Sequence, residues 1–341
     1  MTSHEAGARA RRGARGVRIA VDAMGGDLGP AEIVAGALEA AEHGIDPVLH
    51  GPRGLETGVL ELVEAPETIA MDEKPAEAVR AKPDSSLVSA CRTVAQGGAQ
   101  AVVSAGNTGA MLAACLLELR RLPGVYRPAI AVPLPTPRGV SLLLDAGANA
   151  DARPEHLLQF AHMGVVFAEE IFEIARPDVR LLSIGEEAEK GNALTLEAHA
   201  LLAASDLRFG GNVESRELLA KAADVVVTDG FTGNVCLKLM EGTVKTVLGA
   251  LRDEIAASMR GKLGGALIRP AARRLRSRLD PDTYGGAHLV GLRHVAVIAH
   301  GNSSRRAIAN AIRVAARGVE HDVVGRLAAG LPERRETATK A

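Results

Sequence analysis

The sequence of 341 residues has few aromatic side chains and no long apolar run. It contains no tryptophan, two tyrosines and five phenylalanines, which leaves little material for the platforms on which proteins stack nucleic-acid bases. The net charge is −1, so the basic excess typical of a polyanion-binding domain is also missing. No stretch approaches the roughly 20 apolar residues of a spanning helix. These absences argue against a nucleic-acid-binding protein and against an integral membrane protein.

Cysteine ligand motifs and nucleotide-binding fingerprints are missing as well. Cys91, Cys115 and Cys236 lie far apart within apolar patterns, without CxxC or Cys/His spacing, which argues against disulfide frameworks and zinc sites. We interpret them as buried thiols of a reducing cytosol. Neither GxGxxG nor GxxxxGK[ST] occurs, which counts against a dehydrogenase or an NTPase. We therefore expect no metal and no cofactor.

The domain organisation follows from where the strand and helix patterns run. Residues 1–16 are rich in Arg, Gly and Ala without an apolar core, which indicates a disordered basic arm rather than a secretory signal. Residues 326–341 are predicted to be a flexible tail. Between them, residues 17–325 alternate strand and helix patterns, which predicts a single α/β domain with a largely parallel sheet sandwiched by helices. Residues 51–66 are expected to be irregular, and three prolines at 133–137 to separate two strands.

Six short apolar runs each end in a turn of small or polar residues. These six segments are residues 19–27, 101–109, 142–149, 181–185, 225–234 and 295–304. Such short runs predict strands buried on both faces. Small turn residues allow backbone N–H groups to approach a ligand closely. Turns at the carboxyl ends of neighbouring parallel strands would form one crevice for a small anion, so the pattern indicates a phosphate-handling enzyme.

The turn residues are our candidates for binding phosphate or substrate. They are Gly25, Gly26, Asp27, Ser104, Gly106, Asn107, Thr108, Asn149 and Asn192. The segment from Gly106 to Thr108 precedes a predicted helix, where free N–H donors, the positive end of the helix dipole and a hydroxyl favour an anion. A capped helix start with no ligand explains the same residues equally well.

Four further residues are candidates for catalysis: Lys190, Asn234, Asp229 and His300. Lys190 lies in a glycine-bounded loop after three glutamates, where a lysine can also be a solvated surface charge. Asp229 and Asn234 flank a glycine-containing turn and could instead cap a helix. His300 ends an apolar run before a Gly-Asn-Ser-Ser turn, a position suited to a general acid or base.

A helical insertion over about residues 245–282 interrupts the alternation of strands and helices. From Ile255 to Leu279 there are seven arginines and lysines and no acidic residue. Leu263, Leu267 and Leu275 belong to an apolar stripe that recurs every four residues, and Arg273 and Arg274 lie beside it. The simplest interpretation is a solvated amphipathic helix packed on its own domain or on a dimer partner.

Taken in order, the motifs resemble those of the bacterial phosphate acyltransferases of phospholipid synthesis. The matching segments are Asp22–Asp27, Ser104–Ala110, Asp145–Asn149, Ile184–Glu187 with Lys190, Asp229–Asn234 with Lys238, and Tyr284–Gly286 before His300. The resemblance spans roughly residues 17–320. The sequence departs from the family pattern at Ser183, where an asparagine is expected, and near Ala65 and Pro66, where a histidine is expected.

The resemblance implies an enzyme that transfers a fatty acyl group from acyl carrier protein to inorganic phosphate. It also implies a fold like that of isocitrate and isopropylmalate dehydrogenases, a homodimer, and an acyl phosphate product that feeds a membrane glycerol-3-phosphate acyltransferase. Because phosphate is already a charged nucleophile, we expect direct attack without an acyl-enzyme.

The resemblance also suggests roles for the basic insertion. We expect it to contact the anionic inner face of the cell membrane, acyl carrier protein, or both, which makes the protein cytoplasmic and peripherally associated. Two other classes stay open: an NAD(P)-dependent dehydrogenase of the related fold, and a non-catalytic membrane-surface scaffold that binds phosphate-containing lipids.

Overall fold

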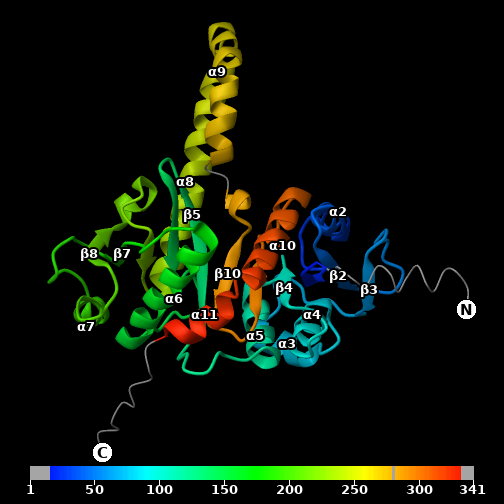
Figure 1. The fold of residues 1–341 in the computed structure, drawn as a ribbon. Helices are drawn as coiled ribbons and strands as arrows, with labels where there is room; N and C mark the ends of the chain where they lie inside the picture. The colour runs from blue at the N-terminus through cyan, green and yellow to red at the C-terminus, as the bar shows by residue number, and fades with distance from the viewer. Residues whose placement is uncertain (1–15, 279–280, 332–341) are drawn as a thin grey trace, which may run out of the picture. The chain divides into compact units, whose positions relative to one another are not determined.

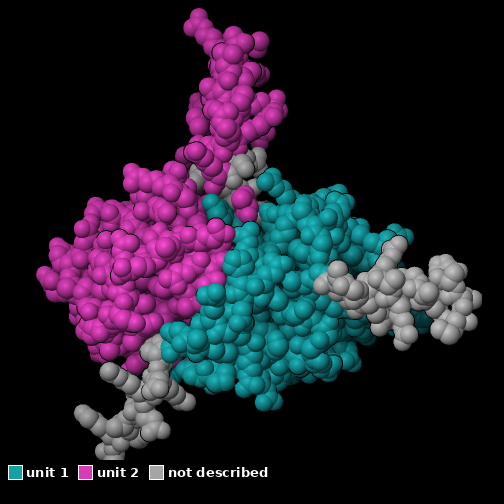
Figure 2. Space-filling view, viewed as in Figure 1, with its two compact units in different colours: residues 1–128, 284–341 teal, residues 129–283 magenta. Residues whose placement is uncertain are grey.

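The computed structural model describes residues 16–278 and 281–331. Most of the predicted basic arm and the end of the predicted tail lie outside these residues. The described chain forms two compact units (Figure 2): unit 1 comprises residues up to 128 and from 284 onward, and unit 2 comprises residues 129–283. Residues 17–325 were expected to form one domain, and the two units are a finer division of that range.

Unit 1 is a sheet with helices on both faces (Figure 1). Its strand order is β3-β2-β1-β4-β11-β10, parallel except for β10. The strands are β1 (Arg18–Asp22), β2 (Asp46–Gly51), β3 (Glu61–Glu64), β4 (Ala101–Ser104), β10 (Ala287–Val290) and β11 (Val295–Ile298). The helices are α2 (Pro30–Ala41), α3 (Pro75–Ala81), α4 (Ser86–Ala95), α5 (Thr108–Glu118), α10 (Arg305–Glu320) and α11 (Val323–Gly330), with the short 3₁₀ turn η3 (Pro281–Tyr284) before β10.

The two faces of the unit 1 sheet differ in polarity. Ile19 and Val21 of β1 belong to an apolar core with residues of α2 and α10. Because side chains alternate along a strand, Asp22 and His50 point to the opposite face, which α4 covers. This face combines apolar packing with buried polar groups at the carboxyl ends of the strands.

Unit 2 is a second sheet with the strand order β5-β6-β9-β7-β8, parallel except for the β5–β6 pair. Its strands are β5 (Ala129–Thr136), β6 (Gly139–Leu144), β7 (Val179–Ser183), β8 (Phe209–Glu214) and β9 (Val225–Val227). Its helices are α6 (Pro154–Phe172), α7 (Ala193–Ala203), α8 (Gly230–Ala256) and α9 (Met259–Arg278), with the 3₁₀ turn η2 (Ser215–Ala220). Gly164 lets α6 lie directly on the sheet, because a Cβ atom there would be 2.6 Å from Val225 Cγ1.

Strand β5 corrects one sequence expectation. It continues through Pro133 and Pro135 and pairs with β6 as far as Thr136, where the prolines were expected to break it. Prolines two residues apart lack their N–H groups on the same side of a strand, so the other side remains able to pair.

Strand β3 is a second correction, since it lies within residues 51–66 that were expected to be irregular. Its burial is only partial, which explains its weak apolar pattern.

Helices α8 and α9 form a hairpin that extends away from the strands of unit 2 (Figure 1). Small residues make the contact between them, since a Cβ on Gly265 of α9 would be 2.6 Å from Ile255 Cγ2 of α8. The leucine stripe of α9 is therefore left exposed, with Leu263 at 70% and Leu267 at 78%. None of the helices in the described residues is long and apolar enough to cross a membrane.

Candidate functional site

In unit 1 the turns after β1 and β4 pack closely against each other through hydrogen bonds and glycine backbone. Ser104 Oγ donates to Asp22 Oδ2 at 2.7 Å and accepts from the Gly106 N–H at 3.0 Å. A Cβ on Gly25 would lie 2.6 Å from both Asp22 Oδ2 and the Gly106 nitrogen. The close approach of the two backbones thus requires a glycine at position 25, while a Cβ on Gly106 would lie 3.2 Å from Ser104 Oγ, a tight contact. The pair of turns forms a compact surface of backbone groups at the carboxyl edge of the sheet.

The turn after β11 joins this pair. The Ala299 N–H donates to the Ser104 carbonyl at 2.9 Å, and the Asp27 N–H donates to the Gly301 carbonyl at 2.6 Å. His300 lies between these two contacts and is half-buried. The structure therefore brings together the predicted residues of three turns, from β1, β4 and β11, in one place.

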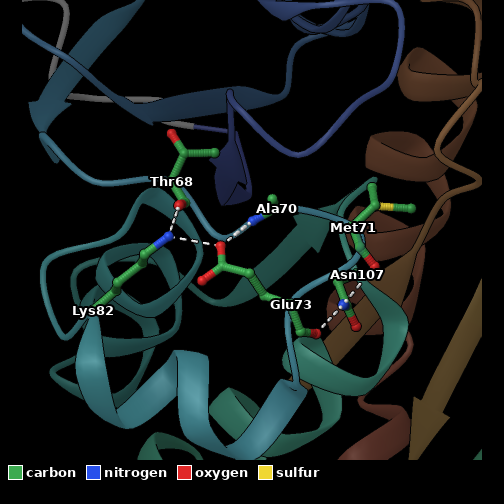
Figure 3. A network of polar contacts seen from close by, with 6 residues as sticks. All are labelled: Thr68, Ala70, Met71, Glu73, Lys82 and Asn107. Atoms are coloured by element: carbon green, nitrogen blue, oxygen red, sulfur yellow. Dashed lines mark hydrogen bonds and ion pairs between the residues drawn. The ribbon is translucent and has the colours of Figure 1, made fainter.

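Asn107 uses its whole side chain in structural contacts (Figure 3). Its Oδ1 caps α5 by accepting from the Ala110 N–H at 3.1 Å, while Nδ2 donates to the carbonyls of Met71 and Glu73 at 3.0 and 3.1 Å. The Asn107 side chain is therefore a helix cap, which was the alternative to a ligand contact. The adjacent Thr108 is exposed, and first-turn N–H groups have no partner within their own helix. The helix start thus retains a hydroxyl and N–H donors for an anion.

The loop that Asn107 holds is itself fixed by charge (Figure 3). Lys82 Nζ donates to Glu73 Oε1 at 2.6 Å and to the Thr68 carbonyl at 2.8 Å. The Ala70 N–H donates to the same Glu73 oxygen at 2.7 Å. The loop from residue 68 to 74 is thereby fastened to the start of α5, beside the three converging turns.

Asp22 belongs to the same group of unit 1 residues but was not among the predicted site residues. Burial raises the pKa of its carboxyl, and hydrogen bonds from Ser86, Ser104 and the Met24 N–H oppose that shift. A carboxylate that accepts so many donors orders the turns around it. The available sequence signal was its position at the end of a buried strand.

In unit 2, Asp145 is the centre of the turn after β6. Its side chain is fully buried and accepts from the backbone N–H groups of Ile130, Gly147, Ala148 and Asn149 at 2.7–3.2 Å. Asn149 Nδ2 adds a fifth bond at 2.9 Å, so this predicted binding residue holds its own turn together. Burial raises the pKa of Asp145, opposed by the Ile130 and Ala148 N–H bonds. Asp145 was also not among the predicted site residues.

The turn after β9 packs against the Asp145 turn. A Cβ on Gly230 would lie 2.7 Å from Asp145 Oδ2, and one on Gly233 would lie 1.9 Å from the Asp145 carbonyl oxygen. Asp229 caps α8, since its carboxylate accepts from the Thr232 N–H at 2.8 Å and the Thr232 hydroxyl at 2.7 Å. Asn234 is exposed in the first turns of α8 and lies beside Gly147, whose Cβ would be 3.8 Å from its side chain. Asn234 is therefore free to contact a ligand at this turn.

Lys190 and Asn192 lie in the loop between β7 and α7. Asn192 caps α7, because its Oδ1 accepts from the Thr195 N–H at 3.0 Å. Lys190 is exposed, and its stem passes over Gly185, where a Cβ would lie 2.8 Å from Lys190 Cγ.

The predicted site residues thus fall into two groups: Gly25, Gly26, Asp27, Ser104, Gly106, Asn107, Thr108 and His300 in unit 1, and Asn149, Lys190, Asn192, Asp229 and Asn234 in unit 2.

Neither a cysteine nucleophile nor a metal cluster is evident. Cys91 and Cys115 are buried, and the Cys115 contact followed by burial raises the pKa of Cys91 well above its usual range. Burial, and then Asp229, raise the pKa of Cys236, so Cys91 and Cys236 are poor sources of a thiolate. Within residues 16–278 and 281–331, no group of three His, Cys, Asp or Glu side chains could hold a metal ion.

Comparison with known proteins identifies the family of the chain. Residues 17–326 match a family model described as "Fatty acid synthesis protein". A phosphate acyltransferase of Heliobacterium modesticaldum is 48% identical over 332 residues, which cover 94% of this chain and 99% of that protein. One from Moorella thermoacetica is 48% identical over 318 residues, covering 90% and 94% of the two chains. The fold is shared with a phosphotransacetylase of Streptococcus pyogenes at a TM-score of 0.59, with 18% identity and coverage of 94% of this chain and 100% of that one.

These matches assign the chain to a class of enzyme and to a family. The chain is an α/β enzyme of fatty acid and phospholipid synthesis. It belongs to the phosphate acyltransferase family. The mostly parallel α/β architecture and the family predicted from the ordered motifs are thereby confirmed, and the dehydrogenase and non-catalytic scaffold alternatives lose their support.

Proposed function

We propose that the enzyme transfers a fatty acyl group from acyl carrier protein to inorganic phosphate. The observation that carries the proposal is the convergence of three strand-end turns on the exposed start of α5, which offers N–H donors and the Thr108 hydroxyl to an oxyanion. The membership in the phosphate acyltransferases supports the same reaction.

In the proposed reaction a phosphate oxygen attacks the carbonyl carbon of the carrier thioester. A C–O bond forms and the carbonyl oxygen becomes an oxyanion; the C–S bond then breaks, and the thiolate leaves and takes up a proton. Phosphate needs positioning rather than activation, so donors that hold it and donors that meet the oxyanion supply the catalysis. The raised thiol pKa values support direct attack without an acyl-cysteine.

Each group of residues has a proposed part in this reaction. The unit 1 turns and Thr108 bind phosphate, and His300 holds or supplies the proton at the leaving sulfur. In unit 2, Lys190 and Asn234 contact an anionic group of a substrate, while Asp229 and Asn149 keep their turns in shape.

The reaction is tested by mixing the protein, an acyl-carrier thioester and phosphate, then measuring acyl phosphate and free carrier. Lys190→Ala should lower kcat/KM by about 10²–10³-fold, because a cationic contact to charge that develops in the transition state is lost. Lys221→Ala is the matched control, since Lys221 is paired with Asp224 at 3.5 Å and should keep activity. Thioester cleavage that does not depend on phosphate would contradict the proposal, and a fully active Lys190→Ala would remove Lys190 from the site.

The exposed hairpin carries our proposal for partners and location. The exposed side chains of α9 suit an anionic membrane surface, with the acidic carrier protein sharing the basic patch. They are Leu263, Leu267, Leu275, Arg273 and Arg274. We propose peripheral attachment to the inner face of the cell membrane, where the acyl phosphate would reach a glycerol-3-phosphate acyltransferase. A homodimer remains part of this proposal.

A further inference from the structure

The loop between β7 and α7 fixes the backbone of Lys190 on both sides. The Lys190 N–H donates to the Glu187 carbonyl at 3.0 Å, and the Ser183 hydroxyl donates to the Lys190 carbonyl at 2.8 Å. A Cβ on Gly191 would lie 1.9 Å from Thr195 Oγ1, so the chain after Lys190 is also confined. The main chain at Lys190 therefore has little freedom.

The Lys190 side chain, in contrast, is not paired. Three glutamates lie within four residues of it in sequence, yet no carboxylate in the described part of the chain makes an ion pair with its ammonium group. An exposed ion pair gains little free energy, so the neighbouring carboxylates do not compete strongly for this ammonium. It is available to an anion from outside the chain.

A buried amide on the neighbouring strand holds the same loop. Asn212 of β8 is 3% exposed, and its Nδ2 donates to the Glu187 carbonyl at 2.8 Å. The Glu187 carbonyl therefore accepts two bonds, one from Asn212 and one from the Lys190 N–H. The loop conformation at Lys190 depends on where Asn212 points.

His199 of α7 fixes that orientation. Its Nδ1 lies 2.9 Å from Asn212 Oδ1. Because an amide oxygen only accepts, Nδ1 of His199 carries the proton. The imidazole also packs edge-on against Phe209, with ring centroids 5.1 Å apart. Both ends of the Asn212 amide are thus satisfied, which is the condition for a buried polar network to specify one geometry.

We propose that Asn212, oriented by His199, and Ser183 are positioning residues that hold the Lys190 ammonium unpaired for the substrate anion. The inference rests on the proposed role of Lys190 in acyl transfer to phosphate. None of the three touches the reacting atoms; they act through the backbone of residues 187–190. Their loss should change the placement of Lys190 before it changes the fold of unit 2.

The test compares variants of the full-length enzyme in the acyl phosphate assay. Asn212→Asp keeps the acceptor for His199 but loses the donor to Glu187, and it should lower kcat/KM for phosphate about tenfold or more, because a buried donor is replaced by an acceptor facing an acceptor. Asn212→Ala should act in the same direction. Ser183→Ala should lower kcat/KM as well, whereas Ser183→Thr keeps the hydroxyl and should retain activity. Ser205→Ala is the matched control, since its hydroxyl donates to the Leu202 carbonyl at 2.6 Å in a turn that does not carry Lys190.

A double-mutant cycle separates positioning from a merely structural role. In a Lys190→Ala background, Asn212→Asp should cause little further loss, because the group that it positions is already gone. An equal loss in both backgrounds would overturn the proposal, even if Lys190 proves essential. If Lys190→Ala is fully active, the proposed role of Lys190 fails first, and this inference fails with it. Denaturant unfolding of each variant checks that the Asn212 variants remain folded.

Discussion

At the scale of single residues, most polar groups at the strand ends are occupied by the fold. Asn107, Asn192 and Asp229 cap helices, and Asp22 and Asp145 collect the N–H groups of their own turns. The groups that stay available to a ligand include the Thr108 hydroxyl and His300 in unit 1, and Asn234 and the Lys190 ammonium in unit 2. A turn that can present such groups has to be ordered by buried polar residues beneath it.

His50 is one of these buried polar residues and should make stability depend on pH. It is 0% exposed, its Nδ1 lies 2.9 Å from Ser89 Oγ, and within the described residues its Nε2 has no hydrogen-bond partner. Burial lowers its pKa from 6.5 to about 4. As the pH falls from 6.5 toward 4, the His50 imidazole is protonated in the unfolded chain but stays neutral in the folded chain. The unfolding free energy present above pH 6.5 is therefore lost over this range.

His50→Gln should remove this dependence. Between pH 7 and pH 4 the wild type should lose up to roughly 3 kcal/mol more unfolding free energy than the variant, as the shift implies. Chemical unfolding across that pH range measures the difference. His43→Gln, at an exposed position of the same unit, is the control and should follow the wild type. Parallel curves for wild type and His50→Gln would contradict the assigned pKa.

At the scale of elements, the outer part of the α8–α9 hairpin differs from the helices that cover the two sheets. Helices α2, α4, α6 and α10 bury residues against strands, whereas α9 packs on α8 at Gly261 and Gly265 and leaves its leucines exposed. Exposed apolar side chains beside arginines are costly to maintain unless a partner covers them. We therefore expect the hairpin to be an interaction element rather than part of the core.

Replacing Leu267 and Leu275 with Glu should abolish binding to vesicles of equal parts phosphatidylcholine and phosphatidylglycerol. The substitutions place negative charge on the apolar stripe, which opposes both insertion and attraction to anionic lipid. Activity on a soluble acyl donor should be unchanged. Vesicle sedimentation measures the binding. Val59→Glu, a similar change at a 90% exposed site of unit 1, should bind like the wild type; unchanged binding by the double variant would rule out the hairpin as the contact.

At the scale of the molecule, unit 1 is completed by segments from both ends of the described chain. Helices α2 and α10 pack on the same face of its sheet, although about 270 residues separate them. Gly36 makes this contact close: a Cβ there would lie 2.5 Å from the Arg305 carbonyl oxygen and 2.7 Å from Ile308 Cβ. The turns that carry Asp27 and His300 are positioned by this packing, since they lead into α2 and α10.

Gly36→Ala should therefore destabilise the protein. In a helix, alanine is usually better than glycine by up to about 1 kcal/mol, but here the overpacking cost of roughly 1–3 kcal/mol should exceed that gain. Gly249→Ala in α8, where a Cβ would meet nothing within 4 Å, should raise stability slightly. Denaturant midpoints of the two variants should move in opposite directions. A higher midpoint for Gly36→Ala would mean that α2 and α10 separate easily.

The sequence predicted the architecture because its signals are local. Short apolar runs, glycine turns and cap residues each depend on a few neighbouring positions, so the alternation of strands and helices could be predicted, as could the starts of α5 and α8. The sequence did not predict strand β3, which is only partly buried, or the continuation of β5 through two prolines. Both depend on pairing with a neighbouring strand. The family followed from the order of motifs along the chain.

The sequence did not show which polar side chains make structural hydrogen bonds and which are available to a ligand; this depends on the tertiary structure. Whether Asn107 faces a ligand or a loop depends on the Met71 and Glu73 carbonyls, more than 30 residues away in sequence. Asn212 and His199 gave no sequence signal, because their importance lies in a chain of hydrogen bonds that ends at the backbone beside Lys190. The order of local motifs along the chain is enough to predict the turns and to identify the family. Which polar groups of those turns already have hydrogen-bond partners, and which stay available to the substrate, follows only from the folded structure, because a hydrogen bond joins two positions that folding brings together.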